Sequence, residues 1–329
     1  MTQTSTQPAS TQNPNSADRP LIYVNGKMVS RTQARVGVYD HGLLYGDGIF
    51  EGIRVYKGKI FKCKQHMDRL YHSAEGIFLN IPVSPDEMVE IMRRCIEANE
   101  LIDGYIRLLV TRGEGSLGLN PYQCPTPGIV CIADQISLYK PAMYELGMRV
   151  VVARRPKTPI ACLDSRVKSL NYLNNILAKL EAIHLSRSLG ITDPQDQLLE
   201  VIMCNLHGQV AEGSGDNIFF VKDGALVTPP VSACILEGIT RRFVKNELCP
   251  ACRFMIEERN FTLDELFDAD EVFLTGSAAE MIAVREILEH DGNGHITASH
   301  TISDGEGPIT KTLRSKFREI VTSNHVPED

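Results

Sequence analysis

Lys168 has the sequence setting of a reactive amine. Apolar residues recur after it with the i, i+3, i+4 spacing of a buried helical stripe, at Leu170, Leu173, Ile176, Leu177, Leu180 and Ile183. This spacing places Lys168 in or just before the first turn of a helix, where free N–H groups disfavour a cation. A lysine among apolar neighbours and positive dipoles loses its proton more easily, and a neutral amine is the nucleophile that forms a Schiff base. The alternative is a solvated surface lysine.

Two turns and one acid could complete such a site. A helix beginning at Gly238-Ile239-Thr240 and the turn Thr275-Gly276-Ser277-Ala278 both point N–H groups and hydroxyls outward, which suits a phosphate. Glu212 lies in a tight backbone setting, with glycines one and three residues after it. The alternatives are helix capping for the two turns and a solvated loop carboxylate for Glu212.

Together these features match one cofactor. Pyridoxal 5'-phosphate requires a Schiff-base lysine, an acid that holds its ring nitrogen protonated, and anion sites for its phosphate. Each feature has an ordinary alternative, and their joint occurrence favours a pyridoxal phosphate site.

Seven motifs follow one another along the chain: Tyr45-Gly46 through Phe50-Glu51-Gly52-Ile53-Arg54, His66-Met67-Asp68-Arg69-Leu70, Tyr105-Ile106-Arg107, Lys168-Ser169-Leu170-Asn171-Tyr172, Glu212-Gly213-Ser214-Gly215-Asp216-Asn217, Gly238-Ile239-Thr240-Arg241 and Thr275-Gly276-Ser277-Ala278-Ala279-Glu280. In these motifs the chain resembles the branched-chain aminotransferases and their relatives among the fold-type IV pyridoxal phosphate enzymes, from about residue 21 to residue 320. The resemblance implies an α/β (α+β) fold with a smaller N-terminal α/β domain and a larger C-terminal domain containing a pseudo-barrel of strands. It also implies a homodimer or larger assembly, because in this family the site lies at a dimer interface.

The resemblance implies a role for each matching residue. Lys168 would form the Schiff base and move the proton between Cα and the cofactor's C4′ carbon, and Glu212 would pair with the pyridine nitrogen. Tyr172 would bind the phenolic oxygen, although it follows the lysine by four residues where the branched-chain enzymes have five. The phosphate would be bound by Arg69, Gly238, Ile239, Thr240 and Ser277. The substrate pocket would be lined by Tyr45, Phe50, Gly52, Arg54, Tyr105, Arg107, Tyr139 and Ala278, with Arg107 receiving the side-chain carboxylate of glutamate.

The implied activity is ping-pong amino transfer between L-branched-chain amino acids and 2-oxoglutarate. Lys168-Ser169-Leu170-Asn171 also resembles the D-amino acid aminotransferases. Those enzymes carry an Arg-x-His carboxylate trap where this chain has Ser116-Leu117-Gly118-Leu119-Asn120, so the L-branched-chain activity is favoured. Aminodeoxychorismate lyase is a weaker alternative, because its usual Lys-His-Leu-Asn is absent. A binding protein on the same scaffold would be expected to lose Lys168 or Glu212.

The elements around these motifs predict two domains. Residues 1–19 are polar and predicted to form a disordered tail. Domain boundaries are expected at 20–134, for the small N-terminal domain, and 148–329, for the large domain that carries Lys168, with a linker at 135–147. The first domain should contain a hairpin at 21–29, a second at 53–61, helices at 64–79 and 85–100, and strands at 105–111 and 128–133. The second should contain strands at 149–154 and from 271, and a hairpin at 218–228.

One motif is rejected on mechanism. Residues 113–118 match GxGxxG directly after a strand, but three prolines follow between residues 121 and 127. A dinucleotide fingerprint must open a helix, and this segment cannot be helical.

Composition excludes several classes of protein. The 329 residues are 43% hydrophobic with a net charge of −7, which disfavours nucleic acid as a partner. No apolar run is long enough to span a membrane, and the first residues do not resemble a secretory signal. Nine scattered cysteines do not form a disulfide framework, so we expect a cytoplasmic protein. Cys249-Pro-Ala-Cys252 has no second pair at zinc spacing, and no metal site is expected.

Overall fold

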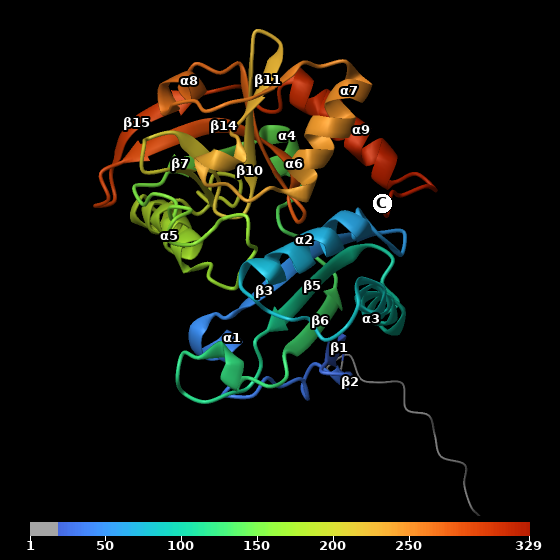
Figure 1. Ribbon diagram of the computed structural model, residues 1–329. Helices are drawn as coiled ribbons and strands as arrows, with labels where there is room; N and C mark the ends of the chain where they lie inside the picture. The colour runs from blue at the N-terminus through green and yellow to red at the C-terminus, as the bar shows by residue number, and fades with distance from the viewer. Residues whose placement is uncertain (1–18) are drawn as a thin grey trace, which may run out of the picture.

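Two β-sheets organise residues 19–329, the part of the chain that the computed structural model describes (Figure 1). The first sheet has six strands in the order β2-β1-β6-β5-β3-β4. All its neighbouring strands are antiparallel. The strands are β1 (Leu21–Val24), β2 (Lys27–Ser30), β3 (Gly48–Tyr56), β4 (Lys59–Ile60), β5 (Gly104–Thr111) and β6 (Gly128–Asp134).

Two helices pack on one another and against the first sheet (Figure 1). They are α2 (Cys63–Gly76) and α3 (Pro85–Ala98), and the short α1 (His41–Tyr45) lies at the end of the sheet. Helix α3 begins with a capping box in which Ser84 and Glu87 bond each other's backbone, and Pro85 takes the first helical position. The core between the helices and the sheet includes Leu70 and Met88, both fully buried.

The second sheet has nine strands and is curled into a half-barrel (Figure 1). Its order is β12-β11-β10-β13-β14-β7-β8-β9, with β15 also paired to β14. The strands are β7 (Met148–Val152), β8 (Glu200–Cys204), β9 (Val210–Glu212), β10 (Asn217–Lys222), β11 (Ala225–Thr228), β12 (Ile256–Glu258), β13 (Glu271–Gly276), β14 (Glu280–His290) and β15 (Ile296–Thr301).

Helices cover this sheet from several sides. A continuous helical run, α6 (Ile239–Phe243), a π-helical turn (Val244–Leu248) and α7 (Cys249–Cys252), packs with α9 (Pro308–Val321) around an aromatic cluster of Phe219, Phe243 and Phe317. Helix α5 (Leu173–Ser188) lies on β7 and β8, and α4 (Pro141–Leu146) and α8 (Leu263–Phe267) complete the set. No helix among residues 19–329 has the length and apolarity needed to cross a bilayer.

The mixed α/β class predicted from the sequence is confirmed, and so are the two N-terminal hairpins, the helices near 64–79 and 85–100, and the hairpin near 218–228. The GxGxxG match opens no α-helix, as predicted, and a short 3-10 turn, Pro121–Gln123, follows it. The predicted disordered tail lies outside the described residues except for Arg19. The chain changes sheet between β6 and β7, and the domain boundaries themselves stay a prediction. The predicted linker 135–147 contains α4, whose Met143 is buried in the core of the second sheet.

The predicted stripe of α5 is wrong. The helix begins at Leu173, and the residues that it buries are Ala178, Ala182, Leu185 and Ser186. Leu173 and Ile176 are 64% and 53% exposed. Apolar residues occur on more than one face of this helix. The face with the small alanines packs on the sheet because it allows the helix to approach the sheet more closely, and the larger apolar side chains therefore turn outward.

Candidate active site

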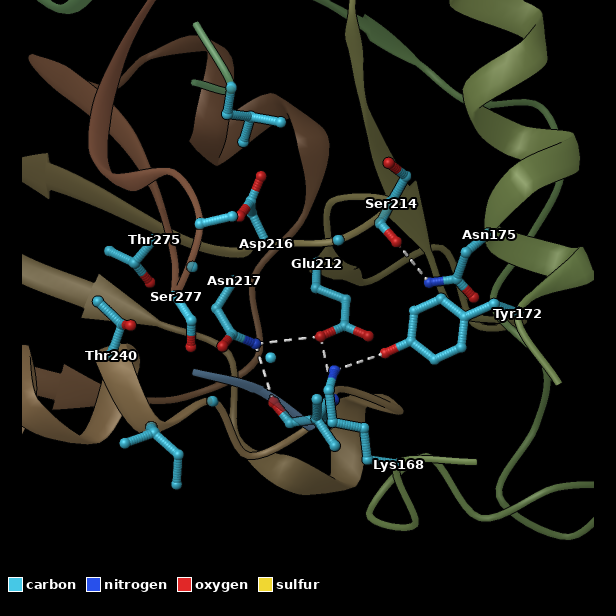
Figure 2. Close-up of a pocket in the computed structure, with 18 of the residues that line it drawn as sticks. Lys168, Tyr172, Asn175, Glu212, Ser214, Asp216, Asn217, Thr240, Thr275 and Ser277 are labelled. Atoms are coloured by element: carbon cyan, nitrogen blue, oxygen red, sulfur yellow. Dashed lines mark hydrogen bonds between the residues drawn. The ribbon is translucent and has the colours of Figure 1, made fainter. Parts of the chain in front are cut away.

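A cavity of about 320 Å³ is lined by residues of both sheets. Figure 2 shows a close-up of it. Strands β3 and β5 supply one wall, and the loops after β9 and β13 supply the opposite wall. The structure brings most of the predicted site residues together here: Phe50, Gly52, Arg69, Tyr105, Arg107, Tyr139, Lys168, Tyr172, Glu212, Gly238, Ile239, Thr240, Ser277 and Ala278.

Lys168 reaches the cavity from an extended segment, which corrects its predicted place at a helix start. Its backbone oxygen accepts a bond from Phe50 N at 3.0 Å, and Leu170 N donates to Gly48 O at 2.9 Å. These bonds pair the segment with β3, so pairing between distant parts of the chain overrides the helical spacing of residues 170–173. The helix dipole is therefore not what acts on Lys168.

The amine of Lys168 is nevertheless activated. Its Nζ lies 3.0 Å from the Tyr172 hydroxyl (Figure 2). It also lies 4.5 Å from the centre of the Phe50 ring. Removal from bulk water, with a further contribution from the Arg69 charge, lowers the pKa of Lys168 to about 7. A substantial fraction of this lysine is therefore neutral at physiological pH. Burial, with Glu212 nearby, raises the pKa of Tyr172 to about 12, so that hydroxyl keeps its proton.

Glu212 is a buried carboxylate with every oxygen engaged. Its Oε2 accepts bonds from Asn217 Nδ2 and Leu236 N, each at 3.0 Å. Its Oε1 lies 2.7 Å from the ammonium of Lys157, a residue that no sequence motif identified. The arrangement holds a negative charge at a fixed place on the cavity wall.

Arg69 is held in place by Glu51. Its Nε and Nη2 donate to the two oxygens of Glu51 at 2.7 Å each, and Nη1 donates to Glu237 O at 3.1 Å. Glu51 also pairs with His66 Nδ1 at 2.7 Å. Burial alone would raise the pKa of Glu51, but the Arg69 and His66 neighbours outweigh burial and lower it. Arg69 keeps two N–H groups free for an anion, since a guanidinium has five.

The remaining donors also fit a phosphate. The side-chain hydroxyl of Thr275 is buried and has no hydrogen-bond partner in the described structure. Gly238 precedes α6 without a side-chain cap, so the first N–H groups of the helical run 239–252 stay available. A neutral lysine, a fixed carboxylate and a set of uncommitted donors around one cavity are the donor set that pyridoxal phosphate needs.

The wall of the cavity formed by β3 and β5 carries a second cation. Arg107 contacts the faces of the Phe50 and Tyr105 rings, with its Cζ 4.8 Å and 5.5 Å from their centres, and has no ion-pair partner among the described residues. Asp216 lies on the opposite wall, where burial, reinforced by the negative charge of Glu200, raises its pKa to about 7. The wall that carries Arg107 thus offers a cation for binding an anion, next to the aromatic rings of Phe50 and Tyr105.

A family model described as Amino-transferase class IV matches residues 48–287, which is most of the chain. The protein belongs to this family. It is 44% identical over 301 residues to a putative branched-chain-amino-acid aminotransferase of Methanocaldococcus jannaschii, covering 92% of this chain and 96% of that one. It is 32% identical over 313 residues to a D-alanine aminotransferase of Staphylococcus epidermidis, covering 93% and 99%. A solved branched-chain amino acid aminotransferase of Escherichia coli superposes with a TM-score of 0.80 at 32% identity, covering 92% and 94%.

This class IV aminotransferase is therefore a transaminase with the fold-type IV architecture, similar to the branched-chain enzymes. Two predicted pocket residues lie outside its cavity. Arg54 shares a face of β3 with Phe50 and Gly52 but lies farther along the strand, where it pairs with Glu280 at 3.1 Å. Tyr45 stands on α1 at the surface, and its hydroxyl donates to Leu117 O.

Several residues of the aminotransferase site were not singled out from the sequence. Asp216 and Asn217 belong to the motif that begins at Glu212, but no role was predicted for them from the sequence. Their position shortly after Glu212 is the sequence feature that could have identified them. Leu138, Asn175, Ile176, Lys179, Glu200 and Leu236 also line the cavity. Nothing in their local sequence marks them, because they come from elements that only the tertiary fold brings together. No group of three or more His, Cys, Asp or Glu that could hold a metal ion occurs within residues 19–329.

Proposed function

We propose that the protein transfers amino groups between L-branched-chain amino acids and 2-oxoglutarate by a ping-pong mechanism, with pyridoxal 5'-phosphate as cofactor. The observation that carries the proposal is that Lys168, with its lowered pKa, and the fixed carboxylate of Glu212 line the same cavity. When bound, the cofactor supplies an electron sink for the bond-breaking at Cα.

Each residue has a task in this proposal. Lys168 holds the cofactor, and its neutral Nζ takes the proton from the substrate Cα and later returns it. Glu212 binds the ring nitrogen, and Tyr172 binds the phenolic oxygen. Arg69 shares the phosphate with the donors of the two turns: Gly238, Ile239, Thr240 and Ser277. The four-residue spacing of Tyr172 is compatible with this task, since its hydroxyl reaches the amine of Lys168 at 3.0 Å.

One pocket serves both amino donors. Arg107 is the receptor for the side-chain carboxylate of glutamate, because it lines the cavity and forms no ion pair with any residue of the range 19–329. The apolar side chains of Phe50, Tyr105, Tyr139 and Ala278 receive an aliphatic side chain, as do those of Leu138 and Ile176. A guanidinium beside aromatic faces suits a pocket that alternates between the two.

The test is a donor panel of L-leucine, L-valine, D-alanine and aminodeoxychorismate, with 2-oxoglutarate where needed and Lys168→Ala as the inactive control. We expect keto acid and glutamate from the two L-amino acids, and no turnover in the control. Pyruvate from D-alanine alone would assign the protein to the D-amino acid enzymes, and pyruvate from aminodeoxychorismate alone would assign it to the lyases.

We also propose a homodimer in a cytoplasmic setting. An exposed apolar surface, here called the α1 surface, comprises Val38, Tyr39, Leu43, Leu117, Leu119 and Tyr122. Leu117, Leu119 and Tyr122 lie on a loop that is hydrogen-bonded to the α1 region. His41 Nε2 lies 2.7 Å from Ser116 O, and Gly115 N donates to Tyr39 O at 3.2 Å. Exposed apolar surface of this kind favours an interface between copies of the chain, and in the proposed homodimer Tyr45 of α1 would line the pocket of the second copy. All nine cysteines are free, in keeping with a reducing compartment.

A further inference from the structure

Lys157 is a buried lysine that the proposed mechanism does not use. Its side chain is 7% exposed, and its Nζ lies 2.7 Å from Glu212 Oε1. Burial alone would lower the pKa of Lys157, but the Glu212 charge outweighs burial and raises it. The two lysines of the site therefore differ in charge: Lys157 remains an ammonium, whereas Lys168 gives up its proton near pH 7.

Lys157 stands behind Glu212 rather than in the cavity. It does not line the cavity that Glu212 and Lys168 share, but a smaller space next to it that Glu212 and Tyr172 also border. Its backbone is fixed, because Lys157 N donates to Cys204 O at 2.9 Å. Asn174 braces both flanking residues, with its Nδ2 donating to Pro156 O at 3.0 Å and its Oδ1 accepting from Thr158 N at 3.3 Å.

The partners of Glu212 have different effects. Asn217 and Leu236 are neutral donors that fix the orientation of the carboxylate. Lys157 is the third group bonded to the carboxylate, and of the three it alone carries a charge. A cation beside a carboxylate stabilises its ionised form and makes it a weaker base. A proton shared between such a carboxylate and a pyridine nitrogen then favours the nitrogen.

We propose that Lys157 is a positioning residue whose positive charge, 2.7 Å from Glu212 Oε1, favours the shared proton on the ring nitrogen of the cofactor. The inference rests on the proposed function, in which Glu212 binds that nitrogen. Lys157 acts through Glu212 and touches neither cofactor nor substrate.

The test measures the ¹⁵N NMR shift of the ring nitrogen in protein loaded with ¹⁵N-labelled pyridoxal phosphate. Lys157→Gln keeps an N–H donor but removes the charge, and Lys157→Arg keeps the charge. Lys62→Gln is the matched control: Lys62 is 6% exposed and pairs with Glu247 at 2.8 Å, away from the cavity. Thermal unfolding of each cofactor-free variant reports any general loss of stability.

We expect the shift of a protonated ring in wild type, Lys157→Arg and Lys62→Gln, and a shift most of the way to the unprotonated ring in Lys157→Gln. An unchanged shift in Lys157→Gln would overturn the role of Lys157 and leave the proposed function intact. If Lys157→Gln does not fold, the other two proteins decide. An unprotonated ring in wild type or in Lys157→Arg would overturn the role of Lys157, and a protonated ring in both supports that role. A wild type that binds no pyridoxal phosphate would overturn the proposed function and this inference with it.

Discussion

At the scale of single residues, neighbours decide which lysine can react. Lys168 and Lys157 both lie close to the Glu212 carboxylate, but Lys157 touches it and Lys168 does not. Lys168 instead has Arg69 as its strongest charged neighbour, and that neighbour is a cation. The pKa values of two similar side chains are thus shifted in opposite directions within one site.

The lowered pKa of Lys168 predicts how the cofactor-free protein reacts with pyridoxal phosphate. Because the neutral amine is the nucleophile, the rate of incorporation should rise as the pH increases through about 7 and level off above it. The rate is measured by stopped-flow absorbance over pH 5 to 10. A midpoint near 10.5, the ordinary pKa of lysine, would show that the burial of this amine has no effect on its reactivity.

Glu51→Gln tests the support of Arg69. The variant leaves the buried guanidinium without a counter-charge, so we expect a loss of about 3–5 kcal/mol in the free energy of unfolding at pH 7. Because the pKa of Glu51 is lowered in the folded state, its contribution is fully present above the ordinary value of 4.5, and it declines progressively as the pH falls from that value towards the lower pKa of the folded state. Urea unfolding at pH 7 and pH 4 measures both effects. Glu319→Gln, on an exposed glutamate that pairs with Lys316 at the surface, is the control, and an equal loss in the two variants would contradict the argument.

At the scale of elements, the sequence predicts those with strong local signals. The α3 helix has a capping box and a proline at its first position, and the β10–β11 hairpin has an Asp223-Gly224 turn, so both are predicted close to their observed bounds. The start of α5 is missed because Leu170 pairs with β3, a partner more than 100 residues away. The clusters around Glu212 and Arg69 are missed because only the tertiary fold brings their members together: Lys157 comes from outside every motif, and Glu51 on β3 meets Arg69 on α2.

The junction before α6 depends on a glycine. A Cβ at Gly238 would lie 1.9 Å from Asn217 Oδ1, and Asn217 is fixed by its bonds to Glu212 and Leu236. Gly238→Ala should therefore displace Asn217, lower the free energy of unfolding by about 1–3 kcal/mol and weaken pyridoxal phosphate binding. Urea unfolding and a cofactor titration measure the two effects. Gly118→Ala, where the nearest atom to the new Cβ is 3.6 Å away, should change neither, and a Gly238 variant that matches it would refute the steric argument.

At the scale of the whole molecule, the active site depends on how the two sheets are held together. Glu280, at the start of β14, accepts from Tyr56 Oη at 2.7 Å and pairs with Arg54 at 3.1 Å, both on β3, and with Arg318 of α9 at 2.8 Å. This buried cluster joins the strand that carries Phe50 to the turn that carries Ser277. The two walls of the cavity are therefore joined directly by this cluster.

In the proposed homodimer, we expect a second copy of the chain to complete that cavity. Leu173 and Ile176 of α5 and the α1 surface are apolar and exposed in a single chain, and Tyr45 lies beside the latter. If Tyr45 serves the pocket of the partner, Tyr45→Ala and Lys168→Ala should complement each other within one dimer. The intact site then combines Lys168 of one subunit with Tyr45 of the other.

Co-expression with two affinity tags isolates this hybrid dimer. Each homodimer should be impaired, Tyr45→Ala at least about tenfold in activity, whereas the hybrid should recover about half of the wild-type activity because one of its two sites is intact. If Tyr45 acted on its own subunit, the functional lysine and the functional tyrosine would never share a site, and the hybrid would stay as impaired as the homodimers. A Leu43→Glu variant, with a charge in the α1 surface, should be monomeric by analytical ultracentrifugation; a dimer would place the interface elsewhere.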